Sequence, residues 1–176
     1  MATDSTKIMV GAGTFSIGDY TSAGGAGSLT DVGDILTPYE IGSEFANFDV
    51  ETERATGIVA TYPLTDGHTI KVAMAESDPT WLRIAMGQPS ANLTGTTPDK
   101  RLLVGDRAAQ YHQATLVATG IGTTGVRTWT FWKLQVLSKE PIQVGKGVVQ
   151  SYVVTFRALR DSTVATADKY YKQVDA

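Results

Sequence analysis

The sequence contains no cysteine and only two histidines in 176 residues. A chain without cysteine forms no disulfide framework, no thiolate metal site and no cysteine nucleophile. His68 and His112 each fall in a predicted strand, without a second ligand at metal-binding spacing and outside any glycine-flanked serine elbow. We therefore expect no enzyme activity, no metal site and no cofactor.

Long apolar runs and an excess of positive charge are also missing. No segment approaches the ~20 apolar residues that a membrane-spanning helix needs, and residues 1–7 lack the basic and apolar regions of a signal peptide. The formal net charge of -3 has the wrong sign for a surface that grips phosphate backbones. We expect a soluble chain that has no signal peptide, does not insert into membranes and has no general nucleic-acid-binding surface.

Two glycine-containing segments resemble nucleotide-binding motifs only in part. Residues 11–13 (Gly-Ala-Gly) start like a dinucleotide fingerprint, but the third glycine and the following helix are missing. Residues 145–147 (Gly-Lys-Gly) lack the hydroxyl residue that follows the lysine of a phosphate-binding loop. Both segments are predicted to be turns.

Alternating apolar and polar residues dominate the rest of the chain and predict a mainly β protein. The length favours one domain, residues 1–176, which buries roughly 70% of its unfolded surface. Residues 1–10 are expected to form a flexible arm and residues 162–176 a flexible tail, although Tyr170 and Tyr171 could instead dock on the sheet. Strands are predicted over residues 46–53, 58–62, 68–75, 111–119, 127–137 and 148–159. Residues 8–18 are interpreted as an ordered arm or a first strand, and residues 29–41 can hold a short strand that ends near Pro38. A turn is expected at Thr65-Asp66-Gly67, and the fold class is an antiparallel β-sandwich or barrel-like subunit.

One helix is predicted among these strands, over about residues 78–87. Asp78 can cap its first amides, Pro79 suits the first helical position, and Gly87 can adopt the left-handed conformation that ends a helix. Thr80 and Arg83 form its polar edge. Its core side is predicted to consist of Trp81, Leu82, Ala85 and Met86, with Ile84 among the same apolar residues. Such an apolar helix must pack against a sheet.

The clearest alternation lies in residues 46–53. Ala46, Phe48, Val50 and Thr52 are expected to face the core, and Asn47, Asp49, Glu51 and Glu53 the opposite side. Alternate residues of a strand lie roughly 6.6–7 Å apart, so these carboxylates do not form a closed calcium cage. On residue chemistry alone, the acidic side is a solvated face.

The order of these segments resembles the tail tube proteins of long-tailed bacteriophages. The resemblance spans most of the chain from about residue 45 to residue 161. It is carried by the strands of residues 45–72, the strand of residues 72–76 that leads into the capped helix, the aromatic strand Trp129-Thr130-Phe131-Trp132 and the closing residues 154–161.

This resemblance implies a β-sandwich subunit that forms hexameric rings, and these rings stack into a hollow tail tube of the virion. The partners would be further copies of the chain, the tail-tip and terminator proteins, and, transiently in the lumen, the tape-measure protein and DNA. Assembly would take place in the host cytoplasm. Because carboxylates repel DNA, Asp49, Glu51 and Glu53 are then expected to face the lumen. The candidates for contacts between subunits or rings are Lys7, Ile8, Arg54, Thr56 and Gly57.

Two other functions remain open from the sequence. A tail terminator or head-tail connector shares such a sandwich but closes a single ring. A carbohydrate-binding or adhesin sandwich would use Trp81, Trp129 and Trp132 as an exposed stacking platform. Trp129 and Trp132 are predicted to lie on opposite faces of one strand, and this arrangement disfavours a flat platform.

Overall fold

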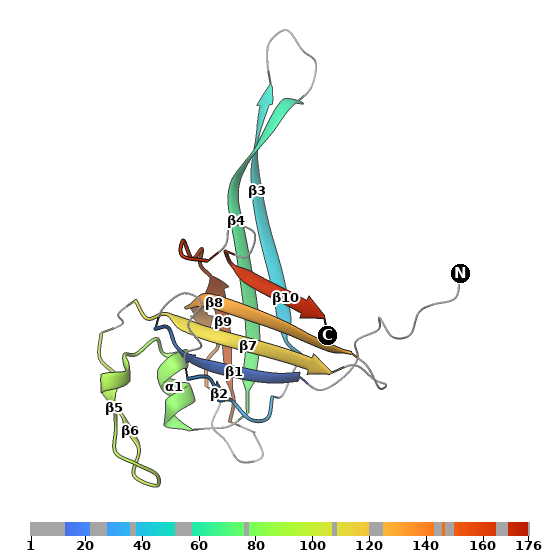
Figure 1. Cartoon of the computed structure of the whole chain (residues 1–176). Helices are drawn as coiled ribbons and strands as arrows, with labels where there is room; N and C mark the ends of the chain where they lie inside the picture. Colours follow the sequence, from blue (N-terminus) through green and yellow to red (C-terminus); the bar gives the residue numbers. More distant parts are fainter. Residues whose placement is uncertain are drawn as a thin grey trace.

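The computed structural model describes residues 13–21, 28–35, 38–51, 58–75, 78–106, 109–119, 125–142, 146, 150–164 and 169–175, without the side chains of residues 45, 51, 59 and 63–66. The chain is mainly antiparallel β with one short α-helix, as the sequence predicts (Figure 1). Its elements are β1 (Gly13–Asp19), β2 (Thr30–Asp31), β3 (Glu40–Glu51), β4 (Ile58–Met74), α1 (Pro79–Ala85), the 3-10 helix η2 (Ser90–Asn92), β5 (Leu93–Thr94), β6 (Arg101–Leu102), β7 (His112–Thr119), β8 (Val126–Lys139), β9 (Tyr152–Ala158) and β10 (Tyr171–Asp175).

Eight strands form one large sheet that folds over on itself. The hydrogen-bonded order is β2-β1-β7-β8-β9-β4-β3, and β10 pairs with β8 as an eighth strand outside this path. The strands β5 and β6 form a separate small hairpin beside α1 (Figure 1). The fold is therefore sandwich-like and is not a closed barrel.

Strand β8 connects the two halves of the sheet. Its first part pairs with β7 and β10, and its second part pairs with β9. The register shifts where Ala114 pairs with Phe131 but His112 pairs with Leu134. In a regular strand, side chains three residues apart point to opposite faces of the sheet. Phe131 and Leu134 are nevertheless both buried, because the register shift lies between them. Bulges of this kind let one strand pass from one layer to the other.

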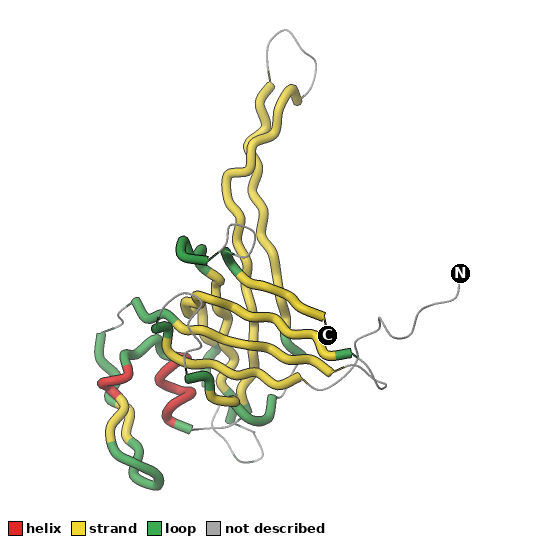
Figure 2. The backbone as a smooth tube through the Cα atoms, in the orientation of Figure 1, coloured by secondary structure: helices red, strands yellow, loops and turns green. Residues whose placement is uncertain are grey.

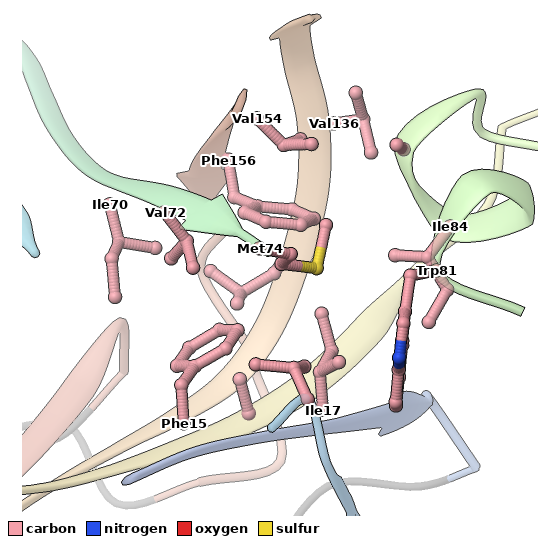
Figure 3. Packing of buried hydrophobic residues seen from close by; sticks show 14 of the residues in the cluster. Phe15, Ile17, Ile70, Val72, Met74, Trp81, Ile84, Val136, Val154 and Phe156 are labelled. Atoms are coloured by element: carbon pink, nitrogen blue, oxygen red, sulfur yellow. The ribbon is translucent and has the colours of Figure 1, made fainter. Parts of the chain in front are cut away.

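Side chains from both halves of the sheet and from α1 fill the core. Phe15 and Ile17 come from β1, and Phe156 comes from β9. Trp81 and Ile84 extend from α1 into the same cluster (Figure 3). Burial of this apolar surface is the main force that holds the helix on the sheet.

The capped helix is confirmed. The Asp78 carboxylate accepts a hydrogen bond from the Thr80 amide at 2.7 Å, Pro79 is the first helical residue, and Gly87 has a φ of 61°. Only glycine adopts this left-handed conformation at little cost, so the helix ends there. Lys100 binds Asp78 at 3.0 Å. Burial disfavours ionisation of Asp78, but the hydrogen bonds from Thr80 and the Lys100 ammonium outweigh it and hold the pKa of Asp78 below its ordinary value.

The predicted turn at Thr65-Asp66-Gly67 is wrong, because β4 continues through these residues. Gly67 pairs with Glu44, and the irregularity lies nearby: Thr65 pairs with Ala46 while Pro63 pairs with Asn47. The backbone at residue 64 is thus the extra residue of a β-bulge. A bulge accommodates a proline in a strand, since proline has no amide hydrogen to donate.

The other predicted strands differ in how far they extend. β7, β8 and β9 lie within or close to the predicted ranges 111–119, 127–137 and 148–159. Where a short strand is predicted within residues 29–41, the described residues form the two-residue strand β2 and the first residues of β3. Tyr171 docks on the sheet as the first residue of β10.

Candidate functional site

The most unusual feature of the molecule is a two-stranded arm that extends beyond the sheet. Strand β9 pairs with β4 only from His68 onward, so residues 58–67 of β4 have β3 as their only strand neighbour among the described residues. We define the arm as residues 45–51 of β3 and 58–67 of β4 (Figure 2). Isolated two-stranded hairpins are marginally stable in water, so an arm of this length favours a partner.

One face of the arm is apolar and uncovered. Phe48 pairs with Tyr62, and Val50 pairs with Ala60. Phe48 is 55% exposed and Tyr62 is 59% exposed. We call these four residues the apolar arm face. A solvent-exposed patch of large apolar side chains usually marks a site of contact with another molecule.

The opposite face of the arm carries the acidic residues, together with the exposed Ile58, which pairs with Glu51. Asp49 pairs with Thr61, whose hydroxyl donates a hydrogen bond to the Asp49 carboxylate at 2.8 Å. Asp49 is exposed, as the predicted acidic stripe requires. Glu51 is the last residue of β3, but its side chain lies outside the described atoms, and Glu53 lies outside the described residues.

The prediction that Ala46, Phe48 and Val50 face the core is wrong, and Thr52, which was predicted with them, lies outside the described residues. The core contact of β3 is made by Ile41, which pairs with the fully buried Ile70. Alternation along β3 places Asn47 and Asp49 on the same side of the strand as Ile41, and Phe48 on the other side. The pattern itself is correct, but its apolar side chains lie on the side of β3 opposite to Ile41, and therefore away from the core.

The predicted contact residues Lys7, Ile8, Arg54, Thr56 and Gly57 all lie outside the described residues. They remain predictions. The described strands β3 and β4 lead into the connection that contains the last three of them. The apolar arm face was missed as a candidate interface, although the alternation in residues 46–50 was visible in the sequence.

Of the predicted helix core, Trp81 and Ala85 are buried at 5% and 2% exposure. Leu82 is partly buried and packs against the core, whereas Met86 is the half-buried C-cap of the helix. Arg83 was expected on a polar edge but is buried at 5% exposure, so this prediction is wrong. The buried positive charge of Arg83 is balanced by an ion pair, because its guanidinium binds the Asp19 carboxylate at 2.9 Å.

His112 joins Arg83 at the same carboxylate. Its Nδ1 lies 3.3 Å from Oδ1 of Asp19, and its ring packs edge-on against Phe156. The close contact with His112 lowers the pKa of Asp19, partial burial opposes this, and Arg83 adds to the lowering, so that the pKa falls to about 2. This partly buried cluster ties α1 to β1 and β7. It is a structural ion pair and contains no serine or cysteine nucleophile.

The cluster predicts how stability responds to acid. The pKa of Asp19 is about 2 in the folded chain and about 3.9 when unfolded. Its ionised form therefore stabilises the fold above about pH 4, and this contribution is lost as the pH falls from about 4 to about 2. We expect Asp19→Asn to lower the free energy of unfolding at pH 7 and to flatten its pH dependence in this window.

Urea titrations between pH 2 and pH 7 measure both quantities. Asp99→Asn, at an exposed carboxylate, is the control, and equal acid slopes for the parent and Asp19→Asn contradict the prediction.

A groove lies at the base of the arm, where β9 ends. It has a volume of about 370 Å³ and is lined by Glu44, Gly67, Tyr170 and residues 157–160 of the β9 end. Arg157 lies 4.0 Å from Glu44, and the groove contains no pair of nucleophile and base. Among the described residues, no three histidine, aspartate or glutamate side chains are grouped to hold a metal ion.

The tryptophans do not form an exposed platform. Trp81 lies in the core, and Trp129 packs against the core while its indole donates a hydrogen bond to Gln173 at 3.0 Å. Trp132 is half-buried. These positions disfavour the carbohydrate-binding alternative, because stacking on a sugar needs exposed ring faces. Within the described part of the chain, every helix is too short or too polar to span a membrane.

Comparison with known proteins supports the fold. No protein-family model matches the chain, and no curated protein matches it. A chain in the cryo-electron microscopy structure of the anti-feeding prophage baseplate, determined with six-fold symmetry, matches over 97% of both chains with a TM-score of 0.53 and 9% identity. The two chains share a fold. At this identity, the likeness carries no residue-level assignment.

Proposed function

We propose that the chain is a structural subunit of a bacteriophage tail tube, without catalytic activity of its own. In this proposal, copies assemble into hexameric rings that stack into the conduit for DNA. The apolar arm face is the observation that carries it, because an exposed apolar ribbon beyond the core is suited to packing against another subunit. The likeness to a six-fold symmetrised baseplate supports the same class of assembly.

The two faces of the arm suit two different environments. The apolar arm face packs against a neighbouring subunit, and the acidic face around Asp49, Glu51 and Glu53 is directed toward the lumen. Repulsion between exposed charges is screened within about 8 Å at physiological salt, so each carboxylate has a small effect. Repeated around every ring, the carboxylates keep DNA and the tape-measure protein from adhering to the wall. Their orientation is tested by fitting the subunit into a map of the assembled tube. Side chains on the outer surface, or within a subunit contact, contradict it.

Electron microscopy of the purified chain tests the proposed assembly. Stacked rings or tubes, formed alone or with a tail-tip or tape-measure partner, are the expected result. Solitary rings that do not stack would favour a tail terminator or head-tail connector. A chain that remains monomeric with these partners would contradict self-assembly. In the virion, the subunit would contact tail-tip and terminator proteins at the ends of the tube.

A further inference from the structure

The groove at the base of the arm is lined by more positive than negative charge, although the chain as a whole is acidic. Of its lining residues, Arg157 and Arg160 are cations and Glu44 carries the one carboxylate. Both arginines are exposed, whereas the formal net charge of the chain is -3. A basic spot on an acidic chain attracts a negatively charged group.

Neither arginine is hydrogen-bonded to a carboxylate among the described residues. A terminal nitrogen of Arg157 lies 4.0 Å from the Glu44 carboxylate, which is beyond hydrogen-bond distance. Arg160 has no ion-pair partner in the described part of the chain. The next residue, Asp161, is buried, and its carboxylate accepts hydrogen bonds from the amide and the hydroxyl of Thr163 instead. The two guanidinium groups therefore keep donors for a bound group.

The walls of the groove are held in place by contacts within the subunit. The backbone amide of Asp161 donates a hydrogen bond to the Lys169 carbonyl at 2.9 Å, which joins the chain after β9 to the residues before β10. The Tyr170 ring packs edge-on against His68, with ring centroids 5.0 Å apart. A preformed site binds at a smaller entropic cost than a loop that must first be ordered.

The groove suits a carboxylate that lies beside an apolar side chain. Guanidinium groups bind carboxylates through charge-assisted hydrogen bonds, and Leu159 and Tyr170 add apolar surface to the lining. Its volume of about 370 Å³ is near the lower end of the ~300–1,000 Å³ of ligand pockets, so it admits a short segment. A single carboxylate balances the two arginines and Glu44. A nucleic-acid strand would bring further phosphates against an acidic chain.

We propose that this groove binds a short acidic segment of another protein. One carboxylate of the segment lies between Arg157 and Arg160, and an apolar neighbour packs against Tyr170. The groove contains none of the four residues of the apolar arm face. The inference therefore does not depend on the proposed assembly, and it adds a second contact surface to the subunit.

Fluorescence anisotropy with a labelled peptide tests this binding. The probe carries the core Ser-Glu-Leu-Glu-Ser, and a matched peptide carries glutamine in place of both glutamates. The acidic peptide should bind with a Kd below about 1 mM, and the glutamine peptide at least about tenfold more weakly. Arg160→Gln should weaken binding of the acidic peptide about tenfold, because it removes a charge-assisted pair. Glu44→Gln should strengthen this binding, because it removes the one repelling carboxylate of the groove.

A matched variant separates the groove from net charge. Arg101→Gln removes the same charge from the exposed first residue of β6 and should leave peptide binding unchanged. Circular dichroism must give each variant the far-ultraviolet spectrum of the parent.

Several results would overturn the acidic-segment groove. Equal binding of the two peptides, or parent-like binding by Arg160→Gln, contradicts it directly. Tighter binding of a short single-stranded DNA that is lost in Arg160→Gln would make the ligand a phosphate backbone. Self-association that weakens in Arg160→Gln, without peptide binding by the parent, would make the occupant a second copy. A chain that binds the acidic peptide but never forms rings overturns the proposed tube and leaves the groove standing.

Discussion

Replacing Trp81 with alanine lowers the free energy of unfolding by about 3–5 kcal/mol. Trp81 is 5% exposed and belongs to the same buried cluster as Ile17 (Figure 3). Its removal loses a large apolar surface and leaves a cavity under α1, which a seven-residue helix anchored at both ends cannot easily fill. A single domain is stable by only about 5–15 kcal/mol, so this variant loses a large share of its stability. Any assembly of the chain should be lost with the fold.

Denaturant titration followed by tryptophan fluorescence and circular dichroism measures this effect. Leu103→Ala is the control, because Leu103 is 61% exposed and its truncation should change the free energy of unfolding by less than about 0.5 kcal/mol. Trp81→Phe keeps most of the buried volume and should cost less than Trp81→Ala. If Trp81→Ala unfolds at the same denaturant concentration as the parent, α1 does not close the core in the way described.

The helix is the part of the fold that the sequence predicts best, because its signals are local. Asp78, Pro79 and Gly87 each act within one turn of the helix they delimit. Burial of Arg83 could not be predicted in this way, since its partner Asp19 is 64 residues away. A charged side chain enters the core only when the fold supplies such a partner.

The strands show the same division between local and distant causes. Alternation in residues 46–50 correctly separates an apolar from a polar face, but it does not say which of the two faces lies on the core side of the sheet. Gly67 reads as a turn residue, and yet pairing with Glu44 on one side keeps it in a strand. Docking of Tyr171 depends on Phe131 and His68, which are far away in the sequence. Tertiary pairing, rather than local propensity, decides such cases.

Polar substitutions on the apolar arm face should weaken assembly without unfolding the subunit. Phe48→Ser and Tyr62→Ser remove the two large, exposed side chains that face the same side of the arm. Aromatic residues at the centre of an interface commonly contribute 2 kcal/mol or more, so each substitution should raise the assembly midpoint about 10- to 100-fold. The free energy of unfolding should change little, because neither side chain belongs to the core.

Sedimentation velocity and electron microscopy measure assembly, and urea titration measures stability. Leu103→Ser is the matched control, because it also replaces an exposed apolar side chain but lies outside the arm. The contrast with Trp81→Ala is the decisive comparison: loss of Trp81 removes fold and assembly together, whereas loss of Phe48 or Tyr62 weakens assembly alone. Normal assembly of the double variant Phe48→Ser with Tyr62→Ser would mean that the arm makes its contacts through the polar face. The carboxylate of Asp49 would then lie in a subunit contact and could not line the lumen.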